Sequence, residues 1–446
     1  MSKFVDRPRY TCALGGALAT LRVIPRAIPI VHASAGCGQN LYNAMNPGGG
    51  YLGGGYCGGL SLPSSNVVER DIVFGGEDRL REQIGTTLEV MDGDLYLVLT
   101  GCMVEMIGDD VEAVVSDFDD SKNPVLAVRT PSFRGNSYTG YELVLKALVK
   151  NYVAKSKQKK SKTVNVLGIV PAQDAFWQGN LREVKRLLKR LGLTVNTLFG
   201  EGETLEDIKK SGQASLNIVV SDIYGLEAAR EYEERHEIPF ITTEFPIGAI
   251  ATEKFLQEVA QALELDPGLT EAVIRDEKAV YYSYLERIAD IYNDIDLQRY
   301  AIIVGDSNYA PAITRFLSDE LGWLPELTVI TDFVDEHQQE KLRSRFNHFE
   351  SEISTTVKFD TDISAIKKYI AQVWPRNRNE RYYDSLSPAV VVGSVYEREL
   401  ATEFGFPLLP VTFPVTNRAV LNRAYVGTNG ALSLVEDLIT LLVAGR

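Results

Sequence analysis

Histidine and cysteine are scarce in this chain, with four of each among 446 residues. The few histidines form no H-E-x-x-H motif and no Ser-His-Asp set, and no glycosidase-like pair of carboxylates stands out, so the common hydrolase sites are not indicated. The cysteines form no C-x-x-C pair, which excludes zinc ribbons and small ferredoxin motifs.

Long apolar runs and an excess of basic charge are also missing. No stretch approaches the ~18–20 uninterrupted apolar residues that span a bilayer, and residues 1–8 form no apolar signal segment. We therefore expect a cytoplasmic protein without a membrane partner, in a reducing compartment where structural disulfides are rare. The net charge of −14 argues against a nucleic-acid partner, because a basic face is needed to neutralise phosphates.

The chain does contain a repeated alternation of short apolar strands and amphipathic helices. A strand at 164–170 is followed by a helix at 180–192, and the pattern restarts with a strand at 300–306 and a helix from about 309 to 322. Buried strands that alternate with helices are typical of doubly wound parallel sheets. We predict an α/β fold of three Rossmann-like doubly wound domains with mostly parallel sheets. Further strands are expected at 194–199, 216–220, 327–331 and 389–394.

Two segments divide these domains. The basic run 155–162 is typical of a solvated surface linker rather than a nucleic-acid site, and the helical region 270–296 is expected to bridge the second and third sheets. The predicted domains are an N-terminal α/β domain at 1–162, a second Rossmann-like domain at 163–296 and a third at 297–446.

All four cysteines, Cys12, Cys37, Cys57 and Cys102, lie in the first 102 residues, and three of them adjoin glycine. Cysteines that merely fill a core should scatter along the chain as small apolar residues. Their clustering on glycine-containing turns indicates a metal–sulfur site. The wide spacing suits an iron–sulfur cluster, which takes one thiolate per ligated iron. Inert structural thiols are the alternative that composition leaves open.

Other motifs carry weaker signals. The loop 48–59 has eight glycines in twelve residues but matches neither nucleotide-binding pattern, so we expect it to be moulded against a cluster or a partner chain. His32 lies in an apolar run, either as a core histidine or hydrogen-bonded near a cluster. The pair Asp109-Asp110 is expected to cap a helix. The remaining histidines are expected on the surface: His236, His337 and His348.

Read together, these segments resemble component 1 of nitrogenase and its relatives over essentially the whole chain. The ordered motifs V-F-G-G, C-x-x-E-x-I-G-D-D and T-P-S-F-x-G are specific to that superfamily, and the last is closest to the β-type (K-like) subunit. Weaker similarity continues to the C-terminus. The segments that carry the resemblance are 12–17, 31–37, 64–76, 100–110, 130–141, 179–180, 305–306 and 413–418.

The resemblance implies a ligand set for an iron–sulfur cluster. Residues matching Cys12, Cys37 and Cys102 supply thiolates to the P-cluster, an 8Fe-7S cluster shared with the α-type subunit, and the residue matching Ser132 lies beside it and can ligate the oxidised cluster. Cys57 matches no family ligand. The N-terminal domain would thus be the cluster-binding one.

The resemblance also implies partners and a role. An α-type (D-like) subunit completes an α2β2 heterotetramer, and a transient ATP-hydrolysing 4Fe-4S reductase supplies electrons. The catalytic cofactor is expected in the α-type subunit, so no catalytic residue is expected here. This agrees with the absence of any cysteine after Cys102 and any histidine after His348.

The chain departs from nitrogenase β-subunits in several places. Those subunits usually have a longer N-terminal extension, Gln-Pro after the first cysteine and Gly-x-Gln-Gly before the second, where this chain has Ala13-Leu14 and the segment 33–36. The departures favour a nitrogenase-like enzyme, of which methylthio-alkane reductase, a C–S bond-cleaving enzyme, is the first choice. The alternatives are a true nitrogenase β-subunit, a cofactor-assembly scaffold and a tetrapyrrole-reducing relative.

Overall fold

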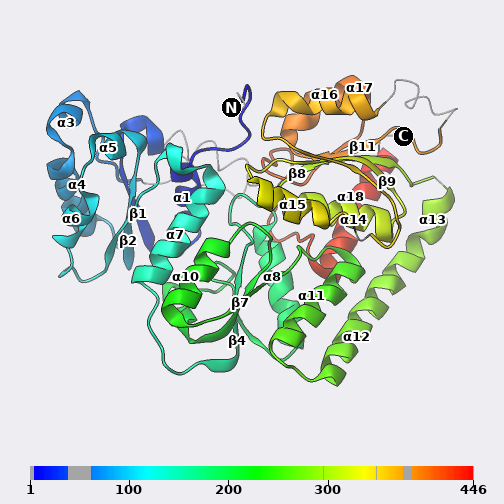
Figure 1. Cartoon of the computed structure of the whole chain (residues 1–446), viewed down its shortest axis with the longest axis horizontal. Coiled ribbons are helices and arrows are strands. Elements are labelled where there is room, and N and C mark those ends of the chain that lie inside the picture. Colours follow the sequence, from blue (N-terminus) through cyan, green and yellow to red (C-terminus); the bar gives the residue numbers. More distant parts are fainter. Residues whose placement is uncertain (1–4, 39–61, 295, 348, 375–383, 445–446) are drawn as a thin grey trace.

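The computed structural model of the chain describes residues 5–38, 62–294, 296–347, 349–374 and 384–444. These residues form three sheets flanked by helices, one after another along the chain (Figure 1). Every strand pair in the sheets of this described part is parallel. The predicted α/β fold with parallel sheets is therefore confirmed, while the exact domain boundaries stay predictions.

The first sheet, in the order β1-β2-β3, is covered on both faces. Ile30 and Val98 point to one face and pack with α4 and α6, whereas Val31 and Leu97 point to the other and pack with α1 and α7. Parallel strands need cover on both faces, which explains their continuous apolar sequences. The elements are α1 (Ala13–Arg22), β1 (Ala27–His32), α3 (Glu69–Phe74), α4 (Glu77–Val90), β2 (Leu95–Thr100), α5 (Cys102–Ile107), α6 (Val111–Ser116), β3 (Val125–Val128) and α7 (Ser137–Asn151).

The second sheet has the order β5-β4-β6-β7, in which the chain moves outward from β4 in both directions. This reversal of strand order defines a doubly wound sheet. Its elements are β4 (Lys160–Leu167), α8 (Trp177–Arg190), β5 (Thr194–Asn196), α9 (Leu205–Lys210), β6 (Ala214–Val219), α10 (Leu226–His236), β7 (Phe240–Thr242), α11 (Gly248–Ala262), α12 (Pro267–Leu285) and α13 (Ala289–Asp294).

The third sheet has the order β10-β9-β8-β11-β12, which is the Rossmann order 3-2-1-4-5 when the strands are counted within the sheet. In such sheets, ligands bind at the carboxyl ends of the strands, where the order reverses. The elements are β8 (Tyr300–Gly305), α14 (Tyr309–Arg315), β9 (Leu324–Ile330), α15 (Glu336–Ser344), β10 (Thr356–Phe359), α16 (Ile363–Val373), β11 (Val390–Gly393), α17 (Arg398–Phe404) and β12 (Leu408–Pro410).

The last helix, α18 (Gly427–Ala444), leaves the third sheet and packs against α8, α11 and α12. Among the described residues it is the one helix long and apolar enough to cross a membrane by length and composition, with a mean hydropathy of 1.2. Its buried side chains, such as Leu434 and Leu438, lie in the main apolar core. A core helix of a packed domain meets the same criterion, and this packing identifies α18 as one.

Each strand and helix expected in residues 163–446 has an observed counterpart within a few residues, whereas the elements of the first sheet were not predicted individually. Strand β4 begins at Lys160, inside the basic run that was expected to be a linker. The first three residues of the strand are exposed, and the strand is buried only from Thr163 onward. Apolar composition detects only the buried part of such a strand. The helix expected from about residue 309 begins as α14 at Tyr309 and continues as a π-helical turn, Phe316–Glu320.

Candidate metal centre

Three of the predicted site residues follow the carboxyl ends of adjacent strands. Cys37 comes after β1, Cys102 after β2 and Ser132 after β3. The strands are parallel and His32 pairs with Thr100 at their ends, so the three residues lie along the same edge of the first sheet. The fold thus gathers residues that are far apart in the sequence.

Cys102 and Ser132 are in direct contact. The Cys102 Sγ lies 3.0 Å from the Ser132 Oγ, and the backbone N–H of Ser132 donates to the same sulfur at 3.1 Å. The contact is fixed by Thr130, whose N–H donates to the Thr100 Oγ1 at 3.0 Å and whose hydroxyl donates to the Thr100 carbonyl at 2.8 Å. The T-P-S-F segment is therefore tied to the end of β2, which places a hydroxyl and an N–H against the thiol.

Cys12 lies next to the loop that follows β3. It precedes α1, forms an antiparallel bridge with Asn136, and is followed by Ala13, whose N–H donates to the Gly135 carbonyl at 3.1 Å. The approach depends on glycine: a Cβ on Gly16 would lie 1.7 Å from the Ser137 carbonyl oxygen. The α1–α7 crossing thus holds Cys12 beside the loop that carries Ser132.

Cys37 lies in the helical residues 35–38 that follow β1, and it is half-buried. Its N–H donates to the Ser34 carbonyl at 3.1 Å, and its Sγ lies 3.5 Å from the Ser34 Oγ. Cys12 and Cys102 are also half-buried, and all three are free thiols. Free, partly exposed thiols at one sheet edge can be reached by a group that bridges two subunits.

A sequence profile of the family "Nitrogenase component 1 type Oxidoreductase" matches residues 12–443. The chain belongs to this family. It is therefore a component of a catalytic oxidoreductase complex, and the predicted membership of the nitrogenase component 1 superfamily is confirmed.

The similar proteins include nitrogenase β chains of all three metal types. The chain is 25% identical to the molybdenum-iron protein beta chain of Methanococcus maripaludis, covering 98% of this chain and 94% of that one. It is also 25% identical to the vanadium-iron protein beta chain of Trichormus variabilis, covering 99% and 94%. The solved structure "Nitrogenase Cp1 at pH 6.5" superimposes with a TM-score of 0.80 at 22% identity, covering 100% and 94%, and shows the same fold.

The thiols of this component 1 family member are donors of the kind that iron–sulfur clusters take. The described residues contain no group of three or more His, Cys, Asp or Glu side chains that could hold one metal ion. Three free thiols and one hydroxyl on a common edge are the donors that such a cluster takes.

His32 is a core histidine with both ring nitrogens in contact with polar partners. It is fully buried at the end of β1, with its Nδ1 2.9 Å from the Ser65 Oγ and its Nε2 3.0 Å from the Asp109 Oδ2. Burial lowers its pKa, although the Asp109 carboxylate raises it in part. Asp109 also accepts the N–H of Gly76 at 3.0 Å, so its carboxylate connects the V-F-G-G motif to the G-D-D motif.

The other expectations for polar residues have mixed outcomes. Asp110 caps α6 by accepting the N–H of Ala113 at 3.1 Å, as predicted, whereas Asp109 binds His32 instead. The surface prediction is correct for His337 and wrong for His236, which is buried and has its Nε2 3.0 Å from the Val149 carbonyl. The charged neighbours of His236 suggested exposure, but His236 lies on the face of α10 that is buried in the core.

His348, Cys57 and the glycine-rich loop lie outside the described residues.

Exposed apolar side chains lie on the elements around the thiol edge. Phe74 on α3 is 82% exposed, Met106 on α5 is 77% exposed and Phe133, next to Ser132, is 66% exposed. Helices α3 and α5 contact each other. A groove of about 430 Å³ continues from Ser132 and Phe133 to Phe333 of the third domain. Exposed apolar residues that form a contiguous patch mark interaction surfaces on soluble proteins.

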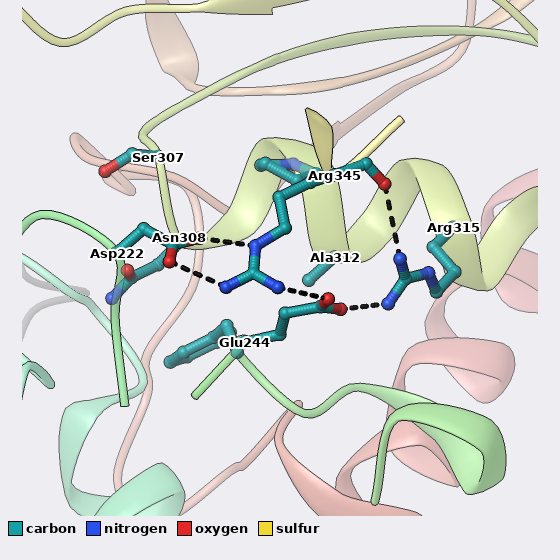
Figure 2. A pocket seen from close by; sticks show the side chains of 9 residues that line it. Asp222, Glu244, Ser307, Asn308, Ala312, Arg315 and Arg345 are labelled. Carbon is teal, nitrogen blue, oxygen red and sulfur yellow. Dashed lines mark hydrogen bonds and ion pairs between the residues drawn. The ribbon is translucent and has the colours of Figure 1, made fainter. Parts of the chain in front are cut away.

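A second cleft, between the second and third domains, is closed by ion pairs (Figure 2). Arg345 donates to both carboxylate oxygens of Asp222, at 2.8 and 2.7 Å, and to Glu244 at 2.6 Å. Arg315 pairs with the other oxygen of Glu244. Lys341 also pairs with Asp222 and Lys254 with Glu244, so these ion pairs join the two domains across the cleft.

Proposed function

We propose that this chain is the β-type subunit of a nitrogenase-like reductase. Cys12, Cys37 and Cys102 would hold an iron–sulfur cluster of the P-cluster type, together with thiolates of an α-type subunit. When bound, the cluster would supply one-electron redox chemistry between an ATP-dependent reductase and the catalytic cofactor of the α-type subunit.

The observation that carries the proposal is the Cys102–Ser132 contact on the edge that also bears Cys37 and Cys12. The N–H of Ser132 donates to the Cys102 sulfur at 3.1 Å, so the backbone after β3 holds this sulfur at the edge of the sheet. The Ser132 hydroxyl, 3.0 Å from that sulfur, is close enough to become a ligand itself. Phe74, Met106 and Phe133 are exposed, which supports the proposal that partner proteins bind over this part of the surface.

For the substrate, we propose a methylthio-alkane whose C–S bond is reduced in the α-type subunit. The support is that the sequence departs from nitrogenase β-subunits directly after Cys12, at Ala13-Leu14, and directly before Cys37, in the segment 33–36. Dinitrogen is the second candidate, favoured by the equal 25% identity to molybdenum-, vanadium- and iron-only β chains. Turnover of dimethyl sulfide and of dinitrogen by the same preparation separates the two.

The cluster assignment predicts that Cys37→Ala and Cys102→Ala each remove the P-type cluster from the complex. Co-expression with the α-type subunit and anaerobic purification should give about eight irons per αβ pair beyond the partner's cofactor in the wild type. Both variants should lose most of this iron and the corresponding EPR signal, because each removes a thiolate and leaves only a serine hydroxyl beside the vacated position, Ser34 near Cys37 and Ser132 near Cys102.

Cys57→Ala is the matched control, since Cys57 corresponds to no ligand of the family; it should keep its iron. Iron content and EPR spectra unchanged in Cys37→Ala and Cys102→Ala would refute the ligand assignment. A wild-type complex without this iron would instead favour an assembly scaffold over a reductase subunit.

A further inference from the structure

The segment before Cys12 is held by the third domain, although residues of that domain are more than 300 positions away in the sequence. We call residues 5–12 the N-terminal strap. It contacts residues that follow β9, β10 and β11 of the third sheet: Thr331, Asp362 and Ser394. The strap therefore crosses the carboxyl edge of a Rossmann-ordered sheet, the place where such sheets bind ligands.

The first anchor of the strap is Asp362, the residue that caps α16. Its carboxylate accepts the N–H groups of Asp6 at 2.9 Å and Arg7 at 3.2 Å, and the N–H of Ile363 donates to the Arg7 carbonyl at 3.1 Å. Although burial alone raises its pKa, the hydrogen bonds it accepts lower the pKa of Asp362 to about 2. The contacts at this anchor use the strap backbone, so they do not depend on the Arg7 side chain.

The second anchor is Arg9, which is 3% exposed. Its guanidinium donates to both carboxylate oxygens of Glu397, at 2.5 and 3.3 Å, and to the Ser394 Oγ at 2.9 Å. Glu397 is fixed in turn by the N–H and hydroxyl of Ser394, at 2.8 and 2.7 Å. Paired Arg–carboxylate contacts fix the orientation of both groups as well as their separation.

The third anchor is Tyr10, two residues from the thiol. Its hydroxyl lies 2.6 Å from the Thr331 Oγ1, and its ring packs edge-on against Tyr138 with 5.2 Å between centroids. Tyr138 lies on α7, one residue after the Ser137 carbonyl against which Gly16 packs. Tyr10 thus contacts the third domain and the helix that bears on Cys12 at the same time.

We propose that Arg9 and Tyr10 are positioning residues for the Cys12 thiol, which they hold at the cluster edge by tying the strap to the third domain. The inference rests on the proposed function, because it takes Cys12 as a cluster ligand. Cys37 and Cys102 lie at the starts of helical segments that directly follow β1 and β2, where backbone hydrogen bonds hold them. Cys12 comes before the first element of that sheet, so its approach depends on the strap on one side and on α1 on the other.

The test compares Arg9→Met and Tyr10→Phe with Arg7→Met, which removes an exposed guanidinium from the same strap. The first readout is the alkylation rate of each thiol by iodoacetamide in the full-length chain, measured by peptide mass spectrometry. Arg9→Met should raise the rate at Cys12 by about tenfold or more through local opening, and Tyr10→Phe by less. The rate at Cys102, and all rates in Arg7→Met, should stay at the wild-type values.

The second readout is the EPR signal and midpoint potential of the cluster in the co-expressed complex. Arg9→Met should shift or abolish them, Arg9→Lys should restore them in part, and Arg7→Met should leave them unchanged. An unchanged Cys12 rate in both anchor variants, or an equal rise at Cys102, overturns the proposal. If Arg9→Met does not fold, Tyr10→Phe decides alone. A wild-type complex without iron refutes the proposed function, whereas the alkylation rates still decide whether the strap holds Cys12.

Discussion

Replacement of Gly16 by alanine should destabilise the first domain by about 3 kcal/mol and remove iron from the complex. The added Cβ would lie 1.7 Å from the Ser137 carbonyl oxygen and 2.4 Å from the Ser137 carbonyl carbon. These are backbone atoms of α7, so no side-chain rotation can make room, and the two helices must move apart. Gly140→Ala should act alike, because its Cβ would lie 2.1 Å from the Ala13 carbonyl oxygen.

The measurement is the melting temperature of the full-length chain, together with the iron content of the complex. The matched control is Gly85→Ala in α4, where an added Cβ meets nothing within 4 Å. Alanine there should raise stability by about 0.5–1 kcal/mol, because glycine is a poor helix former. If Gly16→Ala melts at or above the wild-type temperature and keeps its iron, the close α1–α7 crossing does not position Cys12.

Local sequence predicted several strands of the second and third sheets but none of the three strands of the first sheet. The apolar runs at 164–170 and 300–306, each followed by an amphipathic helix, predicted the buried strands β4 and β8 with small errors at their ends. Such strands are detectable because parallel sheets bury both faces, so their sequences are continuously apolar. The resemblance predicted Ser132 beside the cluster. The structure has its Oγ 3.0 Å from the Cys102 Sγ, while its role at a cluster stays a prediction.

Long-range polar contacts could not be predicted in this way. Arg9 and Glu397 are 388 positions apart, and each looks like an ordinary surface charge in its own segment. Asp109 was assigned to a helix cap, which its neighbour Asp110 provides, because nothing local shows that His32 lies across the sheet from it. Buried pairs of this kind are specified only when the fold brings their elements together.

The proposed ligands also differ in whether contacts within the first sheet or contacts with distant segments hold them. The Cys102–Ser132 contact is fixed by hydrogen bonds at the ends of adjacent strands, so it persists as long as the first sheet does. Cys12 depends on the α1–α7 crossing and on the strap, and both involve segments outside the sheet. Of the three proposed ligands, Cys12 is therefore the one whose position other domains can change.

Stability should fall as the pH rises from about 5 to 8, and Asp306→Asn should weaken this dependence. Asp306 is buried where the three domains meet, with its Oδ2 3.5 Å from the Tyr138 hydroxyl. Burial, reinforced by the nearby Asp332 carboxylate, raises the pKa of Asp306 from 3.8 to about 8. The folded protein then binds a proton that the unfolded chain has released.

The sign follows from this difference in proton binding. Between pH 3.8 and about 8, the folded state carries one more proton at Asp306 than the unfolded state. The contribution of this residue to stability therefore declines as the pH rises through this window and levels off above its folded pKa. Asp362, with a pKa of about 2, has the opposite effect but acts mainly below this window.

Asparagine at position 306 can keep the contacts of Asp306 while it removes the proton. Its Oδ1 can still accept the N–H groups of Asn308 and Tyr309, both at 3.0 Å. Melting temperatures at pH 5, 6.5 and 8 should therefore fall less in Asp306→Asn than in the wild type, with the variant relatively more stable at pH 8. Asp78→Asn, at a fully exposed carboxylate, should keep the wild-type dependence. Equal dependence in Asp306→Asn and the wild type would mean that Asp306 is already ionised in the folded protein across this range.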